Sequence, residues 1–563
     1  MLTRVRSPSI SGSTSPPYWS DLWKLALVFV VLFYSVLFGR PLANPDEGRY
    51  AEIPREMVAT GDYVTPRLNG VKYFEKPPLV YWLTAGAFRV FGVTEFAARF
   101  WPATFGLLGA LITYAAGRAI YDRLTGIFAA TILSTCLYYN GLSRIALLDV
   151  AVTVLMSAAL FAFIIALRQP PGGTRRGLFW AFYASMALAV LSKGLIGLIL
   201  PCAIAGLWVL ALNRWSQLRP FYPFSGALLL LALAAPWHVL AARANPDFLY
   251  FYFVHEHFLR FTTKIHDRYA PWWYFVPILL GGLFPWVVFF FQAVWQSLAG
   301  GWKARIQNET AWFLVIWAVF IFLFFSKSQS KLPPYIIPLF PAVAVLLGRY
   351  LAQAWQAPDS VSLRSPLIVL GVLLFALGVA LPWIKIVRDP SMRTDLWPWQ
   401  LLVSALFVLA GVAVNQLAFR RKLRAALVAV AFGLAAILIA LNPAIAATDK
   451  RSTKPLALAL KAQLQPGDRV YAFHNYFQDL PVYLGRTIDV VDYLGEMEFG
   501  VRSEPEKTRD RFIDLAAFVQ RWGQPARCFA VARKGDVAEL FVRSDFSYVV
   551  LGEFRDQILF ANR

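Results

Sequence analysis

Apolar segments of membrane-spanning length recur up to residue 444, and they constrain the fold of this chain more than any other feature. Each approaches the roughly 20 residues that an α-helix needs to cross a bilayer. The thirteen runs lie at 22–38, 102–120, 124–141, 146–167, 178–192, 195–213, 224–241, 272–297, 310–325, 333–352, 366–384, 399–417 and 424–444. With 58% hydrophobic and only 15% charged residues, the chain is predicted to be a multi-span α-helical membrane protein with about thirteen transmembrane helices.

The charges between these runs predict an orientation. Several short loops on one side carry clusters of Lys and Arg, namely Arg168/Arg175/Arg176, Arg214/Arg219, Lys303/Arg305 and Arg420/Arg421/Lys422/Arg424. The positive-inside rule makes that side cytoplasmic, with residues 1–21 as an N-terminal tail there. The count of thirteen spans does not include the run Leu79–Phe91, which is too short to cross the bilayer. It is expected to form an interfacial or re-entrant helix. Within a membrane domain of residues 22–447, the loop 39–101 then lies on the outer side.

The net charge of +21 comes largely from these dispersed loops. Basic residues scattered among spans do not form the single basic face of a nucleic-acid-binding protein, so nucleic acid is an unexpected partner. Anionic membrane lipids are the expected one. Phosphate-binding glycine motifs such as GxGxxG are absent from the sequence, which disfavours nucleotide-dependent chemistry.

The composition changes after residue 441, and residues 448–563 are predicted to form a soluble domain on the outer side. Five segments have the residue pattern of strands: RVYAFHN, TIDVVDYL, CFAVAR, YVVLGEF and QILFANR. The segments KPLALALKAQLQ and DRFIDLAAFVQRW have helical spacing. This order favours a small α/β sandwich.

The loop that follows the first span holds an unusual number of charges. Its segment Asn44-Pro45-Asp46-Glu47 is typical of a helix start, with Asn44 as cap and Glu47 in the position of a capping box. Asp46 and Arg49 are three residues apart, so they can form an ion pair on one helical face. A capped interfacial helix with a surface salt bridge would explain this pattern, and so would an active site beside the membrane, where ionisable groups are costly.

Two further sites favour the functional alternative. In Tyr73-Phe74-Glu75-Lys76-Pro77-Pro78, a pair of prolines stops any helix directly after an acid and a base, and holds them in a stiff turn. Asp149, in SRIALLDV, lies at the mouth of the fourth span on the same predicted side. The Asp149 side chain can simply reach toward the lipid headgroups. However, it lies on the same predicted side of the membrane as the first two clusters, which points to one shared site.

The segment FYFVHEHFLRFTTK brings charged and titratable side chains into an outer loop, namely His255, Glu256, His257, Arg260 and Lys264. Imidazole and carboxylate ligands suit zinc or a similar divalent ion, and Glu75 is able to complete such a site from its own loop. The two histidines are two residues apart, so a helix would present only one of them to the ion, whereas a strand would present both. A structural role for the histidines is the alternative.

Lys331 and Tyr335, in SKLPPYIIPLFP, flank a second pair of prolines at the entrance to the tenth span. Together they are able to hold a phosphate, although a lysine beside a span often only reaches toward headgroups. Lys193, in LSKGLIG between the fifth and sixth spans, allows the same two interpretations.

Together, the motifs PDEGRYAEIPREM, FEKPPLVYW, SRIALLDV, LSKGLIG, HEHFLRF and SKLPPYIIPLFP resemble the C-type membrane glycosyltransferases, and within them the aminoarabinose transferases that act on lipid A. The resemblance implies transfer of 4-amino-4-deoxy-L-arabinose from undecaprenyl phosphate to a lipid A phosphate. It implies a site at the periplasmic face of the bacterial inner membrane. Masking that phosphate would weaken the binding of polymyxin and other cationic peptides.

The resemblance also implies roles for particular residues. It implies that Asp46, Glu47 and Asp149 are the catalytic acids, and that Lys76 binds the lipid phosphate. The divalent metal, by preference zinc, would fall to Glu75 and to His257 or His255. The remaining candidates for substrate binding are Arg49, Tyr50, Tyr73, Arg260, Lys331 and Tyr335.

Three questions stay open at this point. Asp46 can act as a general base if the acceptor is a hydroxyl, but an ionised lipid A phosphate needs no base, and Asp46 would then position the acceptor or pair with the ammonium group of the sugar. A related enzyme could transfer a polyprenyl-linked sugar to a protein hydroxyl instead. A non-enzymatic transporter of lipid-linked sugar should carry charges at mid-span, whereas here they cluster at span ends.

Overall fold

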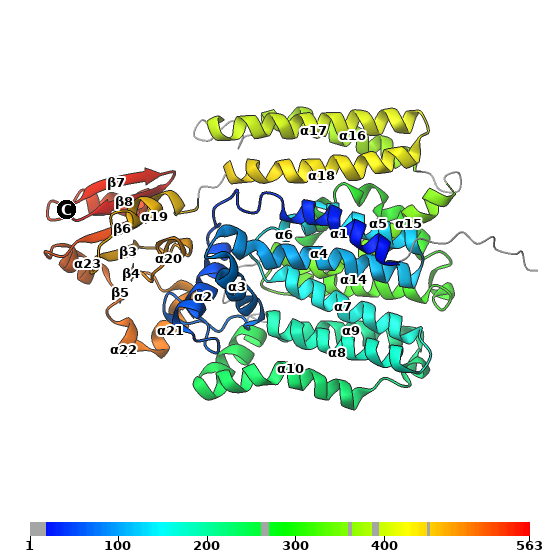
Figure 1. Cartoon of the computed structure of the whole chain (residues 1–563), viewed down its shortest axis with the longest axis horizontal. Helices are drawn as coiled ribbons and strands as arrows, with labels where there is room; N and C mark the ends of the chain where they lie inside the picture. The colour runs from blue at the N-terminus through cyan, green and yellow to red at the C-terminus, as the bar shows by residue number, and fades with distance from the viewer. Residues whose placement is uncertain (1–17, 260–269, 358–362, 385–392, 448–450) are drawn as a thin grey trace, which may run out of the picture.

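A computed structural model describes residues 18–259, 270–357, 363–384, 393–447 and 451–563. Most of the chain forms a bundle of roughly parallel helices, and a smaller sheet domain stands at one end of it (Figure 1). The predicted tail of residues 1–21 lies mainly outside the described residues, and the first helix already covers Tyr18.

Each of the thirteen predicted spans coincides with a helix or with a broken helix. The bundle consists of α1 (Tyr18–Tyr34), α4 (Glu95–Ile120), α5 (Arg123–Thr135), α6 (Leu137–Leu142), α7 (Asp149–Leu167), α8 (Gly173–Lys193), α9 (Ile196–Leu212), α10 (Pro223–Ala244), α12 (Phe275–Gly282), η3 (Trp286–Phe289), α13 (Phe290–Ser297), α14 (Glu309–Lys327), η5 (Pro333–Leu339), α15 (Phe340–Gln356), α16 (Arg364–Ala380), η6 (Leu381–Trp383), α17 (Arg393–Phe419) and α18 (Leu423–Ala447). Short 3-10 helices η1 (Trp215–Leu218) and η4 (Gly301–Ala304) lie in the loops.

Eight of the described helices are long and apolar enough to cross a membrane by themselves. The bent pair formed by Phe275–Gly282 and Trp286–Ser297 would make nine. The predicted spans that fall short coincide with α1, α5, α8 and α9, which are shorter or more charged and lie within the same bundle (Figure 1).

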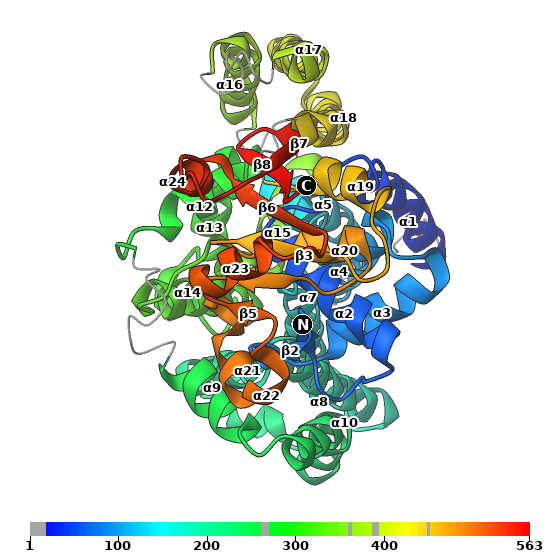
Figure 2. The ribbon, with the colours of Figure 1, turned by 90° about the vertical axis from the view of Figure 1, so that its left-hand side faces the viewer.

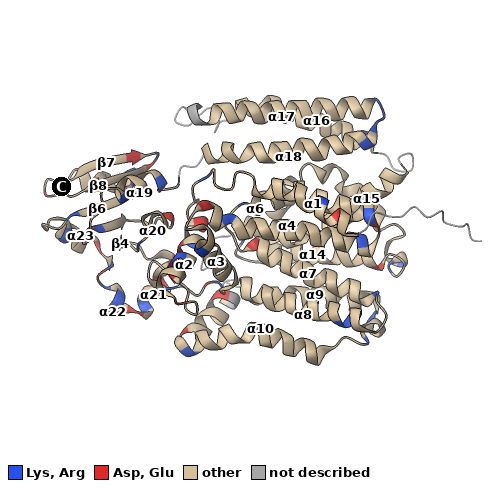
Figure 3. Ribbon diagram, viewed as in Figure 1, with Lys and Arg blue, Asp and Glu red and all other residues tan. Residues whose placement is uncertain are grey.

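Charged residues are distributed differently at the two ends of the bundle. The loops at the end away from the sheet domain are rich in Lys and Arg, while acids gather at the end nearest that domain (Figure 3). The apolar faces between the ends pack into one core, in which Trp208 and Trp317 are fully buried. The bundle thus has a basic end and an acidic end.

The loop between α1 and α4 folds into a cap on the acidic end. It contains α2 (Asp46–Thr60), the short hairpin of β1 (Arg67–Leu68) and β2 (Val71–Lys72), and α3 (Leu79–Phe91). Its helices α2 and α3 lie between the bundle and the sheet domain (Figures 1 and 2). The short run that was expected not to cross is α3, with the expected bounds.

The C-terminal domain is a six-stranded sheet covered by short helices. Its strands are β3 (Arg469–Phe473), β4 (Asp489–Val491), β5 (Phe512–Ile513), β6 (Cys528–Arg533), β7 (Val549–Phe554) and β8 (Gln557–Ala561), in the order β5-β4-β3-β6-β8-β7. The pairs from β5 to β6 are parallel, and those that involve β8 are antiparallel. The helices are α19 (Lys454–Lys461), α20 (Asp479–Leu484), η8 (Gly495–Met497), α21 (Glu498–Ser503), α22 (Pro505–Thr508), α23 (Leu515–Trp522), η9 (Lys534–Val537) and α24 (Ala538–Phe541).

Alternation along the strands divides the domain between two cores. Val470 and Ala472 of β3 belong to the core that is continuous with the bundle, whereas Tyr471 and Phe473 face a separate core that contains α23. Successive strand residues point to opposite faces, so both faces of the sheet are covered. All five predicted strands are present. The segment expected to be one helix over 510–522 instead starts with the strand β5, because pairing with β4 takes up its first apolar residues.

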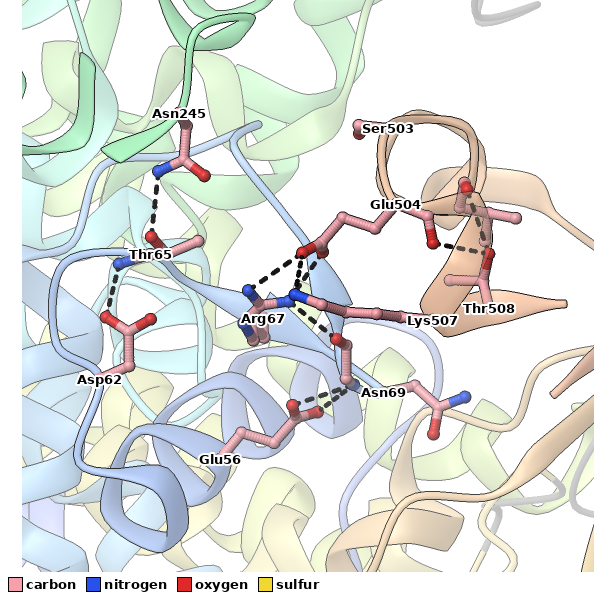
Figure 4. A network of polar contacts seen from close by, with 12 residues as sticks. Glu56, Asp62, Thr65, Arg67, Asn69, Asn245, Ser503, Glu504, Lys507 and Thr508 are labelled. Atoms are coloured by element: carbon pink, nitrogen blue, oxygen red, sulfur yellow. Dashed lines mark hydrogen bonds and ion pairs between the residues drawn. The ribbon is translucent and has the colours of Figure 1, made fainter. Parts of the chain in front are cut away.

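Polar contacts fasten the cap to the sheet domain. Arg67 donates to Glu504 Oε2 at 2.8 Å, and Glu504 also binds Lys507 (Figure 4). The side chain of Asn69 is buried and exchanges hydrogen bonds with the backbone of Ile488, with distances of 3.0 and 2.9 Å. These contacts join segments more than 400 residues apart in the sequence, so the cap depends on both domains for its position.

Candidate active site

A cavity of about 270 Å³ opens at the acidic end of the bundle. Its walls are apolar and come from α9, α14 and η5, with Ile199 and Phe325 among them. Its polar lining consists of Glu75, Lys76, Asp149, Lys193, Glu256, Ser328, Ser330 and Tyr335. An apolar slot with charges of both signs at one end suits a ligand that has a hydrophobic body and a charged head.

Asp149 and Lys193 form an ion pair in this cavity. Asp149 is the first residue of α7 and Lys193 is the last of α8. Helix dipoles favour an acid at the first position and a base at the last, so the two helices present their charges at the same level. The Lys193 ammonium also lies 5.1 Å from the centre of the Tyr335 ring. The predicted acid Asp149 therefore faces a cation.

Lys76 lies in the turn that the two prolines stiffen. Its Nζ donates to the Glu75 carbonyl at 2.7 Å and lies 3.7 Å from Glu256 Oε2. The next helix, α3, begins immediately after Pro78. The predicted pair of acid and base thus reaches the cavity from the cap, opposite Asp149 and Lys193 from the bundle.

The start of α2 lies beside this cavity. Arg49 forms the predicted ion pair with Asp46 and a second one with Glu496 of the sheet domain. It also donates to the Tyr73 hydroxyl at 3.3 Å. The Asp46 side chain remains 51% exposed, so its carboxylate is accessible to a ligand, whereas Arg49 is buried beneath it.

Tyr50 connects the two parts of the site. Burial raises the pKa of its hydroxyl, the Arg49 guanidinium lowers it, and the carboxylates of Asp46, Asp149 and Glu75 raise it further. The three acids predicted from separate segments of the chain therefore all lie within electrostatic range of one tyrosine.

Glu47 has a different environment from its neighbour. Both of its oxygens accept from Arg99, at 2.7 Å each, and it also binds Arg40 and the Ala146 amide. Burial tends to raise its pKa, but the guanidinium groups of Arg99 and Arg40 lower that pKa to about 2. Glu47 is fully buried and is not part of the cavity lining. Its contacts tie α2 to α4 and to the start of α7.

The predicted cap of α2 is wrong. Asn44 does not bond the first turn of the helix, and Pro45 occupies the cap position. The Asn44 side chain instead accepts from the Asp479 amide at 2.9 Å and donates to the Asp479 carboxylate at 2.5 Å. The sheet domain thus takes up the polar groups that a capping box would use, while Glu47 still reaches back to the Ala43 amide at 3.0 Å.

Lys331 lies near the cavity but does not line it. Its Nζ donates to the carbonyls of Ala270 and Ser328 at 2.8 and 2.7 Å. Burial lowers the pKa of this ammonium group. Of the two residues predicted to hold a phosphate from this loop, Tyr335 faces the cavity and Lys331 supports the backbone around it.

The predicted metal ligands include His255 and His257, which lie just before residues 260–269, a range outside the described residues. His255 Nδ1 lies 3.3 Å from Glu256, and Glu256 and Glu75 line the same cavity. The described residues contain no group of three His, Cys, Asp or Glu side chains that could hold an ion. The side chain of His257 and the whole of Arg260 lie outside the described residues. The metal thus stays a prediction.

One acid of the site was not among the candidates. Glu496 comes from the sheet domain, where nothing in the local sequence distinguishes it from other surface acids. Glu256 was expected only as a carboxylate between the two histidines, and its burial beside Lys76 is visible only in the folded chain.

Family models match most of this architecture. Residues 22–252 match the family model described as dolichyl-phosphate-mannose-protein mannosyltransferase. Residues 456–562 match the aminoarabinose transferase C-terminal domain. The crystal structure of ArnT from Cupriavidus metallidurans bound to undecaprenyl phosphate superposes with a TM-score of 0.86 at 29% identity, covering 98% of this chain and 99% of that one. The fold is that of a C-type membrane glycosyltransferase.

Individual relatives identify the family within this class of glycosyltransferases. An undecaprenyl phosphate-α-4-amino-4-deoxy-L-arabinose arabinosyl transferase of Erwinia tasmaniensis is 31% identical over 528 residues, which is 92% of this chain and 93% of that protein. A protein of the same name from Edwardsiella ictaluri is 34% identical over 64% of this chain, and the aligned part spans 65% of that relative. The chain belongs to the family of undecaprenyl phosphate-aminoarabinose arabinosyl transferases.

Proposed function

We propose that the protein transfers 4-amino-4-deoxy-L-arabinose from undecaprenyl phosphate to a phosphate of lipid A. The observation that carries the proposal is the cavity at the acidic end of the bundle, where apolar walls meet the charged side chains of Lys76, Asp149 and Lys193. A polyprenyl chain fits such a wall, and a phosphate fits its cationic end. The Cupriavidus relative was crystallised with undecaprenyl phosphate.

The donor would enter from the membrane with its chain along α9 and α14. Lys76 and Lys193 line the polar end of the cavity, where their ammonium groups would offset the charge of the donor phosphate. That charge grows as the phosphate leaves, so both lysines would stabilise the transition state more than the ground state. Removing one such preorganised group typically costs ~10²–10³ in rate.

The reaction balances without a proton acceptor. An oxygen of the lipid A phosphate forms the bond to the anomeric carbon, the bond from that carbon to the donor phosphate oxygen breaks, and undecaprenyl phosphate leaves with the electron pair. The acceptor is already ionised near neutral pH, so Asp46 would position the sugar through its ammonium group, with Asp149 assisting. Glu47 would hold α2 in place from beneath, because its oxygens are occupied by Arg99 and Arg40.

The charge distribution supports an orientation. Lys and Arg concentrate in the loops at the end of the bundle away from the sheet domain (Figure 3). By the positive-inside rule that end would face the cytoplasm. The site and the sheet domain would then face the periplasm, on the outer surface of the inner membrane, which is where both lipid substrates would be reached.

A second candidate is transfer of a polyprenyl-linked sugar to a protein hydroxyl. The match of residues 22–252 to the protein mannosyltransferase model is the observation in its favour. A hydroxyl acceptor must lose a proton, so Asp46 would then act as general base. The match of residues 456–562 to the aminoarabinose transferase C-terminal domain favours aminoarabinose as the transferred sugar, as in the first proposal.

Mass spectrometry of lipid A would test the proposal. Cells that lack their own transferase would express this protein, its Asp46→Asn form or, as control, its Glu498→Gln form, which changes an exposed acid of the same outer region. We expect a pentosamine on lipid A with the first and third proteins and none with a stably expressed Asp46→Asn form. Unmodified lipid A throughout, with a sugar on membrane proteins, would overturn the proposal in favour of the second candidate.

A further inference from the structure

A second cavity lies among the helices of the bundle, apart from the active-site cavity. It has a volume of about 560 Å³ and is formed between α1, α5 and α18. Its lining is almost wholly apolar and shares no residue with the active-site cavity. We propose that this groove binds one acyl chain of an anionic phospholipid, whose headgroup rests on the basic end of the bundle.

The groove arises from the way the last helices pack. The helices α16, α17 and α18 form a layer along one side of the bundle, with α18 nearest to α1 (Figures 1 and 2). The face of α18 that lines the groove carries small side chains at Ala431 and Ala435. Residues three and four apart share a helical face, so these alanines leave a continuous furrow along α18.

The length of the groove matches one leaflet. On α18 its lining extends from Leu427 to Ile439, which is ~18 Å at the helical rise of 1.5 Å per residue. Half of a hydrocarbon core is roughly 15 Å thick. The groove begins about one turn after the first residue of α18, so it occupies the leaflet at the basic end.

Both hydroxyl groups in the walls already have hydrogen-bond partners. The hydroxyl of Thr131 donates to Ile127 O at 2.8 Å, and that of Thr135 donates to Thr131 O and accepts from Trp286. These hydroxyls offer little to a water molecule, whereas an acyl chain loses no hydrogen bond on entry. The occupant is therefore a hydrocarbon chain.

The mouth of the groove is cationic. Trp355 lines the groove, and Arg424 stacks over its ring at 5.6 Å and donates to its carbonyl at 3.0 Å. The turn before α18 adds Arg420, Arg421 and Lys422, all exposed. The nearby acid Asp21 is already neutralised, because Arg118 and Arg123 bind it at 2.9 and 2.7 Å.

These observations identify the chemistry of the ligand. Basic clusters beside a membrane surface attract anionic lipids, with a contribution of about fivefold in affinity for each Lys or Arg. The two proposed substrates would react at the other end of the bundle, so neither supplies the headgroup. A phospholipid of the leaflet at the basic end, such as phosphatidylglycerol, satisfies both the charge and the length.

Native mass spectrometry would test this site. The delipidated full-length protein in detergent would be titrated with phosphatidylglycerol or with phosphatidylethanolamine of identical chains. We expect tighter binding of phosphatidylglycerol, a loss of about fivefold for Arg424→Gln, and loss of that complex for Ala431→Trp, which fills the groove. Leu409→Trp, which enlarges an exposed residue of α17, is the matched control and should bind as the unaltered protein does.

A second measurement uses the unaltered protein, so its result does not depend on whether a variant folds. Phosphatidylglycerol with a photoreactive group on one acyl chain should crosslink to peptides that contain residues 427–439. Equal binding of the two lipids, with no effect of Arg424→Gln, would overturn the proposal. So would crosslinks confined to other helices, or a dimer of this chain that Ala431→Trp dissociates, since a second copy would then occupy the groove.

Discussion

Arg49 of the cap forms an ion pair with Glu496 of the sheet domain, across 447 residues of sequence. The same guanidinium binds Asp46, so one cation is shared between an exposed acid and an acid from another domain. Burial tends to lower the pKa of the Arg49 guanidinium. The neighbouring acids, Glu496 first among them, outweigh burial and raise that pKa well above its ordinary value. The sheet domain thereby takes part in setting the charge of the site.

Replacing Glu496 should therefore lower the rate of catalysis. In Glu496→Gln, Arg49 would pair with Asp46 alone and hold that carboxylate away from the sugar, so we expect turnover to fall by about 10- to 100-fold. The rate of lipid A modification by purified protein measures this. Glu498→Gln, at an exposed pair with Arg502, is the control. Unchanged turnover in Glu496→Gln would show that the shared cation has no part in the reaction.

Asp149 and Lys193 should be energetically coupled. Each single change, Asp149→Asn or Lys193→Gln, leaves the partner charge without its counter-ion in a mostly apolar cavity. We expect a coupling of about 1 kcal/mol or more in a double-mutant cycle on kcat/KM. Lys193→Arg should retain more activity than Lys193→Gln, because it keeps the charge. Strictly additive effects would mean that the two residues act independently.

Glu47 should matter for stability more than its exposed neighbour does. Glu47→Gln leaves Arg99 buried without its counter-charge, which typically costs about 3–5 kcal/mol. Asp46→Asn removes a half-exposed pair and should cost less than about 1 kcal/mol. Denaturation of both variants in the same detergent gives the two values. Equal stabilities would contradict the structural role of Glu47.

Asp479 should make the joint between the cap and the sheet domain sensitive to pH. Burial raises the pKa of this carboxyl to about 6, although hydrogen bonds from Asn44, Thr453 and Ser452 act to lower it. Because this pKa is raised in the folded state, protonation of Asp479 stabilises the folded protein. The stabilisation is complete below pH 3.8, the ordinary pKa of the carboxyl. That stability, about 3 kcal/mol, is lost as the pH rises to about 6.

The change appears as a difference between two proteins. The melting temperature of the unaltered protein, less that of Asp479→Asn, should fall as the pH rises from 4 to 7. The difference cancels the titration of other acids, which both proteins share. A difference that does not vary with pH would show that Asp479 keeps its ordinary pKa in the folded protein.

The predicted metal can be measured directly. Plasma mass spectrometry of the purified protein should detect about one zinc ion per chain if Glu75 and His257 ligate it as expected. Glu75→Gln and His257→Ala should each lower the zinc content, and His255→Ala should leave it unchanged. Zinc that stays in both of the first two variants would place the ion elsewhere, and a zinc-free unaltered protein would remove it from the site.

Several features of this protein were determined by the sequence alone. Apolar run length identified the helices of the bundle, because a bilayer requires roughly 20 apolar residues of every span. Alternation and β-branched content located the strands β3, β4, β6, β7 and β8. Asp46, Glu75, Lys76 and Asp149 were recognised as one group since charges beside a membrane are costly and these fall on one predicted side.

Only the tertiary structure decided which of these charges act together. It separated Asp46, which is accessible, from Glu47, which Arg99 and Arg40 bury. It also supplied Glu496 and placed Asn44 against Asp479 rather than at a helix cap. Periodicity along a chain reports which face of one helix or strand is buried. The partner of a buried charge comes from another element, and its identity depends on how the elements pack.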